Sequence, residues 1–314
     1  MSSLRQRPVL ILTGGLGNQL FQIAHATYMY PAGTIDVDWR LARPRLDKSG
    51  RPEVQGMNLD KRFVFSTRPN FLRRILFPSY PLRKFSNLYL RKIVTQGNFG
   101  NWSIGNSWFL IIWKIAGFLY FHKSVALNPK SNSSVKFPCL LGYFQDPIWL
   151  NDDNTIDSLS RISCTSTMVD RYKALALSEK PLAVHIRLMD YRFDENIGLI
   201  PRGKFVEVVS ECFRKGDFGK IWLFSDEPLH ALNSLIDFKD SIRVIETNLS
   251  SAETIAVMSL SRAFVISNST FSWWGAYLSD ALPQTIFAPL PWFKVFKTPL
   301  NLIPLGWQTY DPWR

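Results

Sequence analysis

The second half of the sequence alternates between short apolar runs and stretches with helical periodicity, and this alternation limits the possible folds more than any other feature. The apolar runs are "LAVHIR" at 182–187, "KIWLFSD" at 220–226, "IRVIE" at 242–246 and "AFVIS" at 263–267. Apolar side chains recur at helical spacing in the residues that follow each run. Four strand–helix repeats predict a parallel sheet with helices on its faces. Because ligands bind beyond the carboxyl ends of such strands, we expect functional side chains directly after them.

The N-terminal part begins with the same pattern. The apolar run "PVLILT" at 8–13 leads into the turn "GGLGNQ" and then into the helical stretch "LFQIAHATYMY", and "TIDVDW" at 34–39 is a second strand. A chain of 314 residues has room for two domains of ordinary size. We therefore predict an α/β protein with two domains, residues 1–160 and 161–314, that face each other across a cleft.

The stretch "PLAVHIRLMDYR" at 181–192 places charged groups where a buried strand ends. Alternation along a strand puts His185 and Arg187 on one face, so both side chains reach the end of the strand together. A guanidinium there matches the geometry of a diphosphate. Asp190, in the loop beyond, is a candidate general base or a group that orients an arginine. The alternative is a buried ion pair that caps the strand.

A second polar cluster follows the strand at 263–267. Asn268, Ser269 and Thr270 come directly before a helical stretch, so hydroxyl groups and unpaired backbone N–H groups gather at a helix N-terminus. Such a terminus binds phosphate readily. The alternative is an ordinary helix cap by Ser269 or Asn268.

Two further turns carry candidate ligand contacts. Gly15 and Gly17 permit close approach of the backbone to a ligand, and Asn18 has an amide able to bind it; the alternative is an ordinary glycine turn between a strand and a helix. In "LFSDE", Ser225 and Asp226 suit a ribose hydroxyl or a guanine edge, or they cap the next helix. Asp36 and Asp38 invite a metal site, but we interpret them as a strand end and predict no metal.

The net charge of +12 is concentrated in one segment. Residues 61–145 contain thirteen Lys and Arg and no Asp or Glu, together with many aromatic residues. A basic, aromatic surface attracts anionic lipid headgroups or nucleic acid, or it is a solvated face over an ordinary core. No nucleic-acid-binding module is recognisable. We prefer peripheral membrane contact through 61–145, and the odd number of three cysteines indicates a cytoplasmic, reducing environment.

Taken together, the motifs resemble those of the α-1,2-fucosyltransferases of glycosyltransferase family 11. The matching pieces occur in family order and span nearly the whole chain, whereas 45–138 carries no recognisable motif. They are "GGLGNQLFQIAHA" at 14–26, "GYFQDPIWL" at 142–150, "VHIRLMDY" at 184–191, "FSDE" at 224–227 and "ISNSTFSWWGAYL" at 266–278.

The resemblance implies a GT-B-like fold of two Rossmann-like domains, an N-terminal acceptor-side domain and a C-terminal domain that binds the GDP-sugar. It also implies GDP-β-L-fucose as donor and transfer with inversion to the 2-hydroxyl of a galactose-containing oligosaccharide. No metal or other cofactor is implied. The setting would be surface glycan synthesis, such as O-antigen biosynthesis, on an acceptor that is lipid-linked at the inner face of the membrane.

The resemblance also implies roles for individual residues. Arg187 would hold the β-phosphate with support from His185, and Asn18 in the Gly15–Gly17 loop would reach the fucose or phosphate. Asp226, beside Ser225, would lie near the nucleoside. The residues implied around the diphosphate at the helix start are Asn268, Ser269, Thr270 and Phe271.

One motif departs from the family pattern. The family usually reads H-x-R-R-x-D, whereas Leu188 and Met189 follow Arg187 here, and Arg192 is the nearest replacement for the missing charge. The departure keeps two alternatives open. One is a glycosyltransferase of the same fold with another nucleotide sugar, and the other is a non-catalytic, membrane-associated glycan-binding protein.

Overall fold

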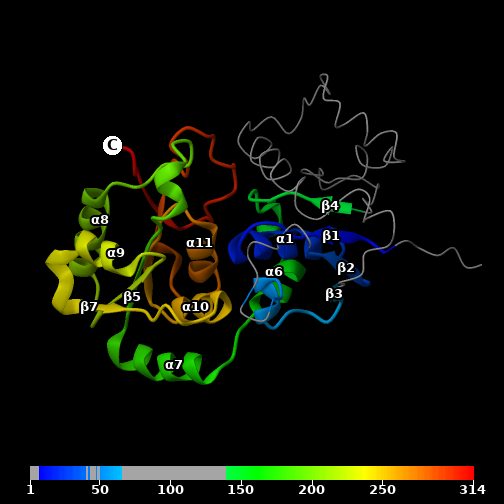
Figure 1. Ribbon diagram of the computed structural model, residues 1–314, viewed down its shortest axis with the longest axis horizontal. Helices are drawn as coiled ribbons and strands as arrows, with labels where there is room; N and C mark the ends of the chain where they lie inside the picture. Colours follow the sequence, from blue (N-terminus) through cyan, green and yellow to red (C-terminus); the bar gives the residue numbers. More distant parts are fainter. Residues whose placement is uncertain (1–6, 40–41, 43–46, 48–49, 66–138) are drawn as a thin grey trace, which may run out of the picture. The chain divides into compact units, whose positions relative to one another are not determined.

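The computed structural model describes residues 7–39, 42, 47, 50–65 and 139–314, and it divides into two compact units (Figure 1). The first unit comprises Met1–Gln55 and Leu59–Arg161, and the second comprises Gly56–Asn58 and Ile162–Arg314. Most of the basic segment 61–145 lies outside the described residues, so membrane contact through it stays a prediction.

The second unit contains a six-stranded, fully parallel sheet in the order β10-β9-β8-β5-β6-β7. Numbered from the first strand, this is the 3-2-1-4-5-6 order of the Rossmann fold. The predicted alternation of strands and helices is confirmed. The strands are β5 (Leu182–Ile186), β6 (Ile221–Ser225), β7 (Ile242–Val244), β8 (Ala263–Val265), β9 (Ile286–Pro289) and β10 (Gln308–Tyr310).

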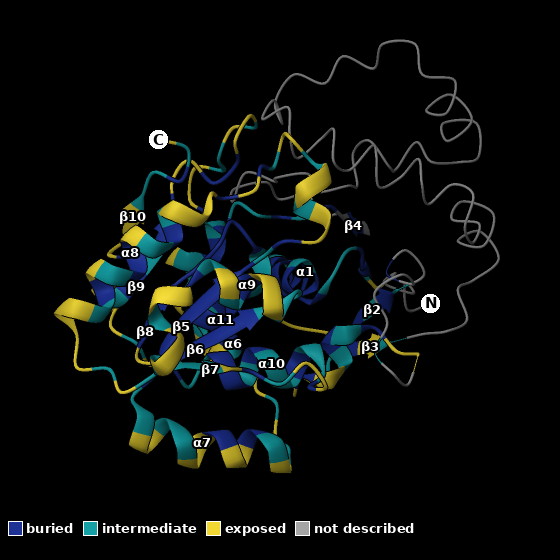
Figure 2. Ribbon diagram, turned by 60° about the vertical axis from the view of Figure 1, so that its left-hand side comes forward, coloured by how far each residue is buried: buried dark blue, intermediate teal, exposed yellow. Residues whose placement is uncertain are grey.

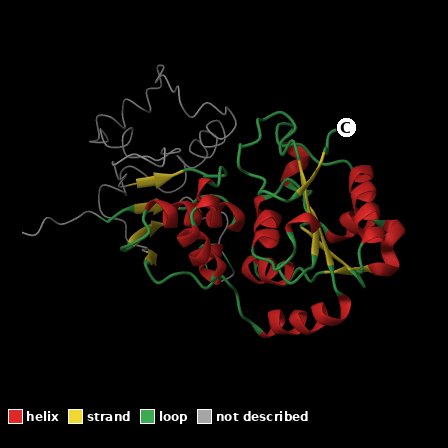
Figure 3. Cartoon of the chain, turned by 180° about the vertical axis from the view of Figure 1, so that it is seen from behind, coloured by secondary structure: helices red, strands yellow, loops and turns green. Residues whose placement is uncertain are grey.

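Helices cover both faces of this sheet (Figure 3). Helix α10 packs against α7 and α11, whereas α8 and α9 pack together with the side chains of β5 and β6 on the other face. A short 3-10 turn, η5 (Asp190–Phe193), follows β5. The α-helices are α7 (Thr167–Glu179), α8 (Arg202–Lys215), α9 (Pro228–Ser234), α10 (Ser251–Met258) and α11 (Thr270–Tyr277), and the other 3-10 helices are η6 (Ile236–Ser241) and η7 (Pro283–Thr285).

Local sequence explains where several of these elements begin and how they pack. Ser250 and Glu253 form a capping box at the start of α10, and Ser166 accepts the backbone N–H of Val169 at the start of α7. The β5 side chains are buried throughout, as Figure 2 shows for the interior strands. A strand buried on both faces requires the continuous apolar run that 182–186 provides.

The first unit repeats the arrangement on a smaller scale. Its four strands are parallel in the order β3-β2-β1-β4, which is the 3-2-1-4 part of a Rossmann sheet. The fold class predicted from the sequence, α/β with two Rossmann-like units, is therefore confirmed. The elements are β1 (Val9–Ile11), α1 (Leu16–Met29), β2 (Ile35–Asp38), η2 (Glu53–Gly56), β3 (Phe63–Phe65), β4 (Cys139–Leu141), η4 (Ile148–Asn151) and α6 (Asp153–Ser160).

Within the described part of the chain, none of the helices combines the length and the apolar character that a membrane span requires.

Candidate functional site

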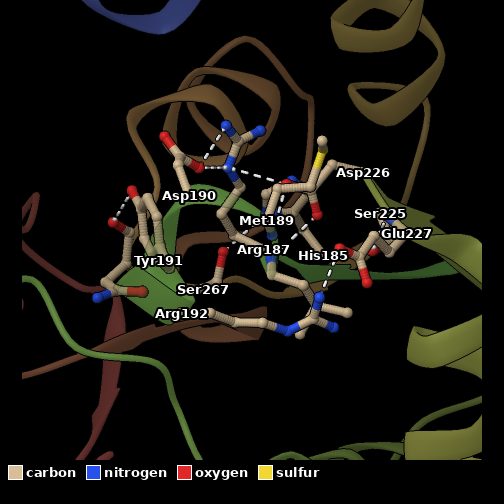
Figure 4. Close-up of polar contacts among 12 residues, drawn as sticks. His185, Arg187, Met189, Asp190, Tyr191, Arg192, Ser225, Asp226, Glu227 and Ser267 are labelled. Carbon is tan, nitrogen blue, oxygen red and sulfur yellow. Dashed lines mark hydrogen bonds and ion pairs between the residues drawn. The ribbon is translucent and has the colours of Figure 1, made fainter. Parts of the chain in front are cut away.

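The strand order of the second unit determines where its site lies. The order reverses between β5 and β8, which are neighbours in the sheet, and a crevice for a ligand opens at the carboxyl ends of two such strands. At this edge His185 of β5 meets Ser267 after β8, and Arg187 after β5 meets Asp226 after β6 (Figure 4). The three polar clusters, which are up to 85 positions apart in the sequence, are thus brought together.

His185 connects the two central strands. Its Nδ1 lies 2.8 Å from the Oγ of Ser267, and both side chains are buried. Burial, together with the charge of Arg187, lowers the pKa of His185 to about 3. The imidazole is therefore neutral at physiological pH, which suits a hydrogen-bonding role. The ring of Phe271 is 6.0 Å away, centroid to centroid.

Arg187 is held between two carboxylates. Its Nε and Nη2 donate to Oδ1 of Asp190 at 3.0 and 2.8 Å, and Nε lies 3.2 Å from Oδ2 of Asp226. Its guanidinium carbon also lies 5.7 Å from the centre of the Tyr191 ring. Burial alone would lower the pKa of Arg187, but the two carboxylates raise it. The ion pair at the strand end, which was the alternative interpretation, is present, and the Arg187 side chain keeps 21% exposure there. Contact of Arg187 with a diphosphate stays a prediction.

Asp226 fixes the backbone that carries Arg187. Its Oδ1 accepts the N–H of Leu188 at 2.9 Å, and its Oδ2 accepts the N–H of Met189 at 3.2 Å. The neighbouring Ser225 hydroxyl accepts the N–H of Glu227 at 3.1 Å. Asp226 and Ser225 thus both stabilise the backbone at the edge of the sheet. Their contact with the nucleoside stays a prediction.

Replacing Asp226 by alanine should therefore destabilise the fold. The change removes the partner of two backbone N–H groups and one of the two carboxylates beside Arg187, and we expect a loss of about 2–3 kcal/mol in the free energy of unfolding. Urea denaturation measures it. Asp217→Ala is the matched control, because Asp217 forms an ion pair with Lys180 but is 88% exposed, and it should change stability by less than about 0.5 kcal/mol. Equal stability of the two variants would contradict this stabilising role of Asp226.

Hydrogen bonds attach the loop between β8 and α11 to the turn at 196–198. The amide of Asn268 donates to the carbonyl oxygens of Ile197 and Gly198, both at 3.1 Å, so its side chain anchors the 196–198 turn. Asn268 is also buried, and direct contact of its side chain with a ligand stays a prediction. Ser269 precedes α11, but its side chain makes no capping hydrogen bond to the helix. The alternative of an ordinary cap by Ser269 is therefore wrong, and Thr270, at the first turn, is half-buried.

Tyr191 is a site residue that sequence reasoning missed. Its hydroxyl donates to the carbonyl oxygen of Asn268 at 3.0 Å and also interacts with Ser269, so η5 is bonded to the loop before α11. Burial raises the pKa of Tyr191 to about 12. An aromatic residue within "LMDYR" gives no signal of such a contact, because the partner lies 77 positions away.

The departure from the H-x-R-R-x-D pattern has a structural counterpart. Leu188 is buried in the core cluster with Ile200, whereas Met189 is exposed. Arg192, the suggested replacement for the missing charge, donates instead to Oε1 of Glu227 at 2.6 Å (Figure 4). Since the Arg192 side chain is directed toward Glu227, it does not extend the positive charge beside Arg187.

The glycine loop of the first unit differs from a phosphate-binding loop. The backbone N–H of Leu16, at the start of α1, donates to Oε2 of Glu53 at 2.8 Å. A carboxylate of the chain thus occupies the position where a helix N-terminus would bind an anion. Gly15 lies at this position, whereas Gly17 is buried inside α1. The Leu16 N–H is therefore already paired with Glu53, and contact of Gly15, Gly17 and Asn18 with a ligand stays a prediction.

Asn18 is also engaged within the first unit. Its Oδ1 accepts the Nε2 of Gln145 at 3.0 Å, which links α1 to the segment after β4. Gly14 has φ of +75°, and a Cβ there would lie 2.7 Å from Nδ2 of Asn18, so only glycine fits. Glu53 and Gln145 were missed because nothing near them in the sequence indicates these contacts. The described ranges contain no group of three or more His, Cys, Asp or Glu suited to a metal ion.

Comparison with known proteins shows the family of the chain. The model of "Glycosyl transferase family 11" matches residues 123–289. An alpha-1,2-colitosyltransferase of Escherichia coli is 26% identical over 90% of this chain and 91% of its own length. The O-antigen biosynthesis glycosyltransferase WbnK of Escherichia coli is 24% identical over 90% of this chain and 93% of its own length.

Two solved structures are similar at a lower level. The fucosyltransferase NodZ from Bradyrhizobium has a TM-score of 0.47 and 13% identity, covering 87% of this chain and 93% of that chain. POFUT1 in complex with GDP has a TM-score of 0.44 and 14% identity, covering 87% of this chain and 95% of that chain. The family match spans more than half of the sequence and includes the loops after β5, β6 and β8. The chain therefore belongs to glycosyltransferase family 11.

Proposed function

We propose that this glycosyltransferase moves L-fucose from GDP-β-L-fucose to the 2-hydroxyl of a galactose-type acceptor, with inversion, in the synthesis of a surface glycan. The observation that carries the proposal is Arg187, a guanidinium fixed by two carboxylates at the switch point of a Rossmann sheet. Family membership supports sugar transfer. The α-1,2 linkage and the O-antigen setting are supported by the names of the two Escherichia coli relatives.

Charge stabilisation is the main catalytic contribution in this proposal. Arg187 would compensate the negative charge that develops on the departing GDP, together with Ser269, Thr270 and the first backbone N–H groups of α11. Asp190 would orient Arg187 and is our candidate for accepting the proton of the attacking hydroxyl. His185 stays neutral and supports the phosphate side of the site through its hydrogen bond to Ser267.

A second donor is favoured by one specific observation. The relative at 26% identity is a colitosyltransferase, and colitose is L-fucose without its 3-hydroxyl group. The same GDP site would serve both sugars, so discrimination would depend on side chains near that hydroxyl. Asn18 and Gln145 of the first unit are our candidates for contact with the sugar, because both are polar, half-buried and placed at the switch point of their own sheet.

One experiment tests both donors and the linkage. The protein is incubated with GDP-fucose, GDP-colitose or a UDP-sugar and a panel of β-galactosides, and products are analysed by mass spectrometry and linkage analysis. We expect a GDP-sugar to raise the melting temperature and to give an α-1,2-linked product, and we propose that EDTA leaves turnover unchanged. A product formed only from a UDP-sugar would overturn the donor assignment. Binding without any product would favour the non-catalytic alternative.

A further inference from the structure

The loop that follows β9, residues 290–306, combines exposed apolar side chains with an excess of positive charge. Val295, Leu300 and Leu305 are 67%, 84% and 100% exposed. From 281 to 310 the sequence contains no Asp or Glu, and its charged residues are Lys294 and Lys297. Exposed apolar side chains that gather in one segment are typical of protein or membrane contact sites, and lysines beside them favour a negatively charged partner.

The loop is anchored, so its exposed side chains are held outward. Trp292 and Phe293 are buried, and the backbone N–H of Trp292 donates to the Thr298 hydroxyl at 2.8 Å, which closes the segment that carries Lys294 and Val295. Farther along, the Nε1 of Trp273 in α11 donates to the carbonyl of Leu302 at 2.6 Å. Such a loop presents the same side chains without a large ordering cost on binding.

A neighbouring turn extends the surface. The backbone N–H groups of Lys294 and Val295 donate to the carbonyls of Ile197 and Asn196 at 3.1 and 3.0 Å, so the turn after η5 lies beside the loop (Figure 1). Phe193 at the end of η5 is 89% exposed. The turn also carries two acidic residues: Asp194 accepts backbone N–H groups of its own turn, and Glu195 is exposed.

We propose that the 290–306 loop and Phe193 form a membrane-docking surface for an anionic lipid bilayer. The apolar side chains would enter the interface, and Lys294 and Lys297 would pair with lipid headgroups. The loop follows β9, whose carboxyl end lies at the same edge of the parallel sheet as the loops after β5 and β8. Docking would therefore bring the edge that bears Arg187 toward the bilayer. This surface is distinct from the basic segment 61–145.

Vesicle sedimentation tests the proposal without donor or acceptor, so it can fail while the proposed function holds. The full chain is mixed with phosphatidylcholine vesicles with or without 30% phosphatidylglycerol. We expect binding to the anionic vesicles at low salt and release at high salt. The double variant Lys294→Glu, Lys297→Glu should bind the anionic vesicles at least about 25-fold more weakly, since each lysine near the bilayer surface contributes about fivefold to binding. The double variant Val295→Ser, Leu300→Ser should bind these vesicles about tenfold more weakly.

Matched variants elsewhere on the second unit are the controls. Leu177→Ser with Leu229→Ser removes two leucines that are each 77% exposed on α7 and α9, and Lys173→Glu with Lys215→Glu reverses two exposed lysines. Neither control should change vesicle binding by more than about twofold, and all four variants should melt like the parent protein. Absence of binding by the parent, or equal binding by the loop variants and the controls, would overturn the proposal.

Sedimentation velocity without vesicles examines the other occupant of an apolar surface, a second copy of the chain. We expect the parent protein and the Val295→Ser, Leu300→Ser variant to sediment identically. A dimer of the parent protein that this variant dissociates would show that the surface packs against itself, which would also overturn the proposal.

Discussion

Arg187→Ala is expected to lower turnover by about 100-fold or more while GDP-sugar still binds. Both Asp190 and Asp226 orient the Arg187 guanidinium at the switch point, so its removal takes away the charge that would meet the departing diphosphate. Loss of a single preorganised charge-stabilising donor typically costs about 10²–10³-fold. Initial rates at saturating donor and acceptor measure the effect.

Three comparisons make this prediction specific. Arg187→Lys keeps a charge but loses the planar donors that bind both carboxylates, so we expect most of the loss to remain. Arg171→Ala is the matched control, since Arg171 lies on α7 and forms an exposed ion pair with Glu246. The turnover of this variant should be unchanged. Unfolding midpoints separate a catalytic effect from misfolding. Turnover of Arg187→Ala within threefold of the parent protein would remove Arg187 from the proposed mechanism.

The parallel sheet of the second unit, and the position of the site at its edge, follow from sequence patterns that are local in the chain. Four of the six strands of the second unit, β5 to β8, are apolar runs followed by a helix, and right-handed crossovers leave few ways to assemble such units. Because parallel strands end at one edge, the groups after β5, β6 and β8 had to converge. The prediction that His185, Arg187 and Asp226 share a site needed no knowledge of their contacts.

The contacts themselves depend on pairs far apart in the chain, which local patterns do not encode. Glu53 reaches the start of α1 across 37 positions, and Gln145 reaches Asn18 across 127. Both contacts pair groups of "GGLGNQ" within the first unit, which the sequence of the turn does not indicate. Likewise, the sequence showed that Arg187 and Asp190 are close but could not show that Asp226 is the second carboxylate.

Buried histidines make acid stability the other large effect that we expect. The pKa of His25 and that of His185 are each lowered to about 3, in both cases chiefly by burial. An unfolded chain takes up a proton on each histidine below pH of about 6.5, whereas the folded protein does not until about pH 3. The two histidines therefore leave the free energy of unfolding unchanged above pH of about 7, and they lower it as the pH drops from about 6.5 toward 3. Each histidine lowers the free energy of unfolding by up to about 1.4 kcal/mol for each unit by which the pH falls in this range.

His25 offers the sharper test of this linkage. Its ring lies 4.0 Å from the Phe144 ring in a stacked arrangement, and neither ring nitrogen has a hydrogen-bond partner among the residues that the structure describes. His25→Leu removes the buried polar atoms, so it should preserve stability at pH 7 within about 1 kcal/mol and reduce the dependence on pH between 6 and 4. His230→Leu is the exposed comparison, because the His230 side chain is 70% exposed and lies beside Glu227. Urea unfolding at pH 7, 6, 5 and 4 measures both variants. Parallel curves for His25→Leu and the parent protein would mean that the proton uptake on unfolding arises at groups other than His25.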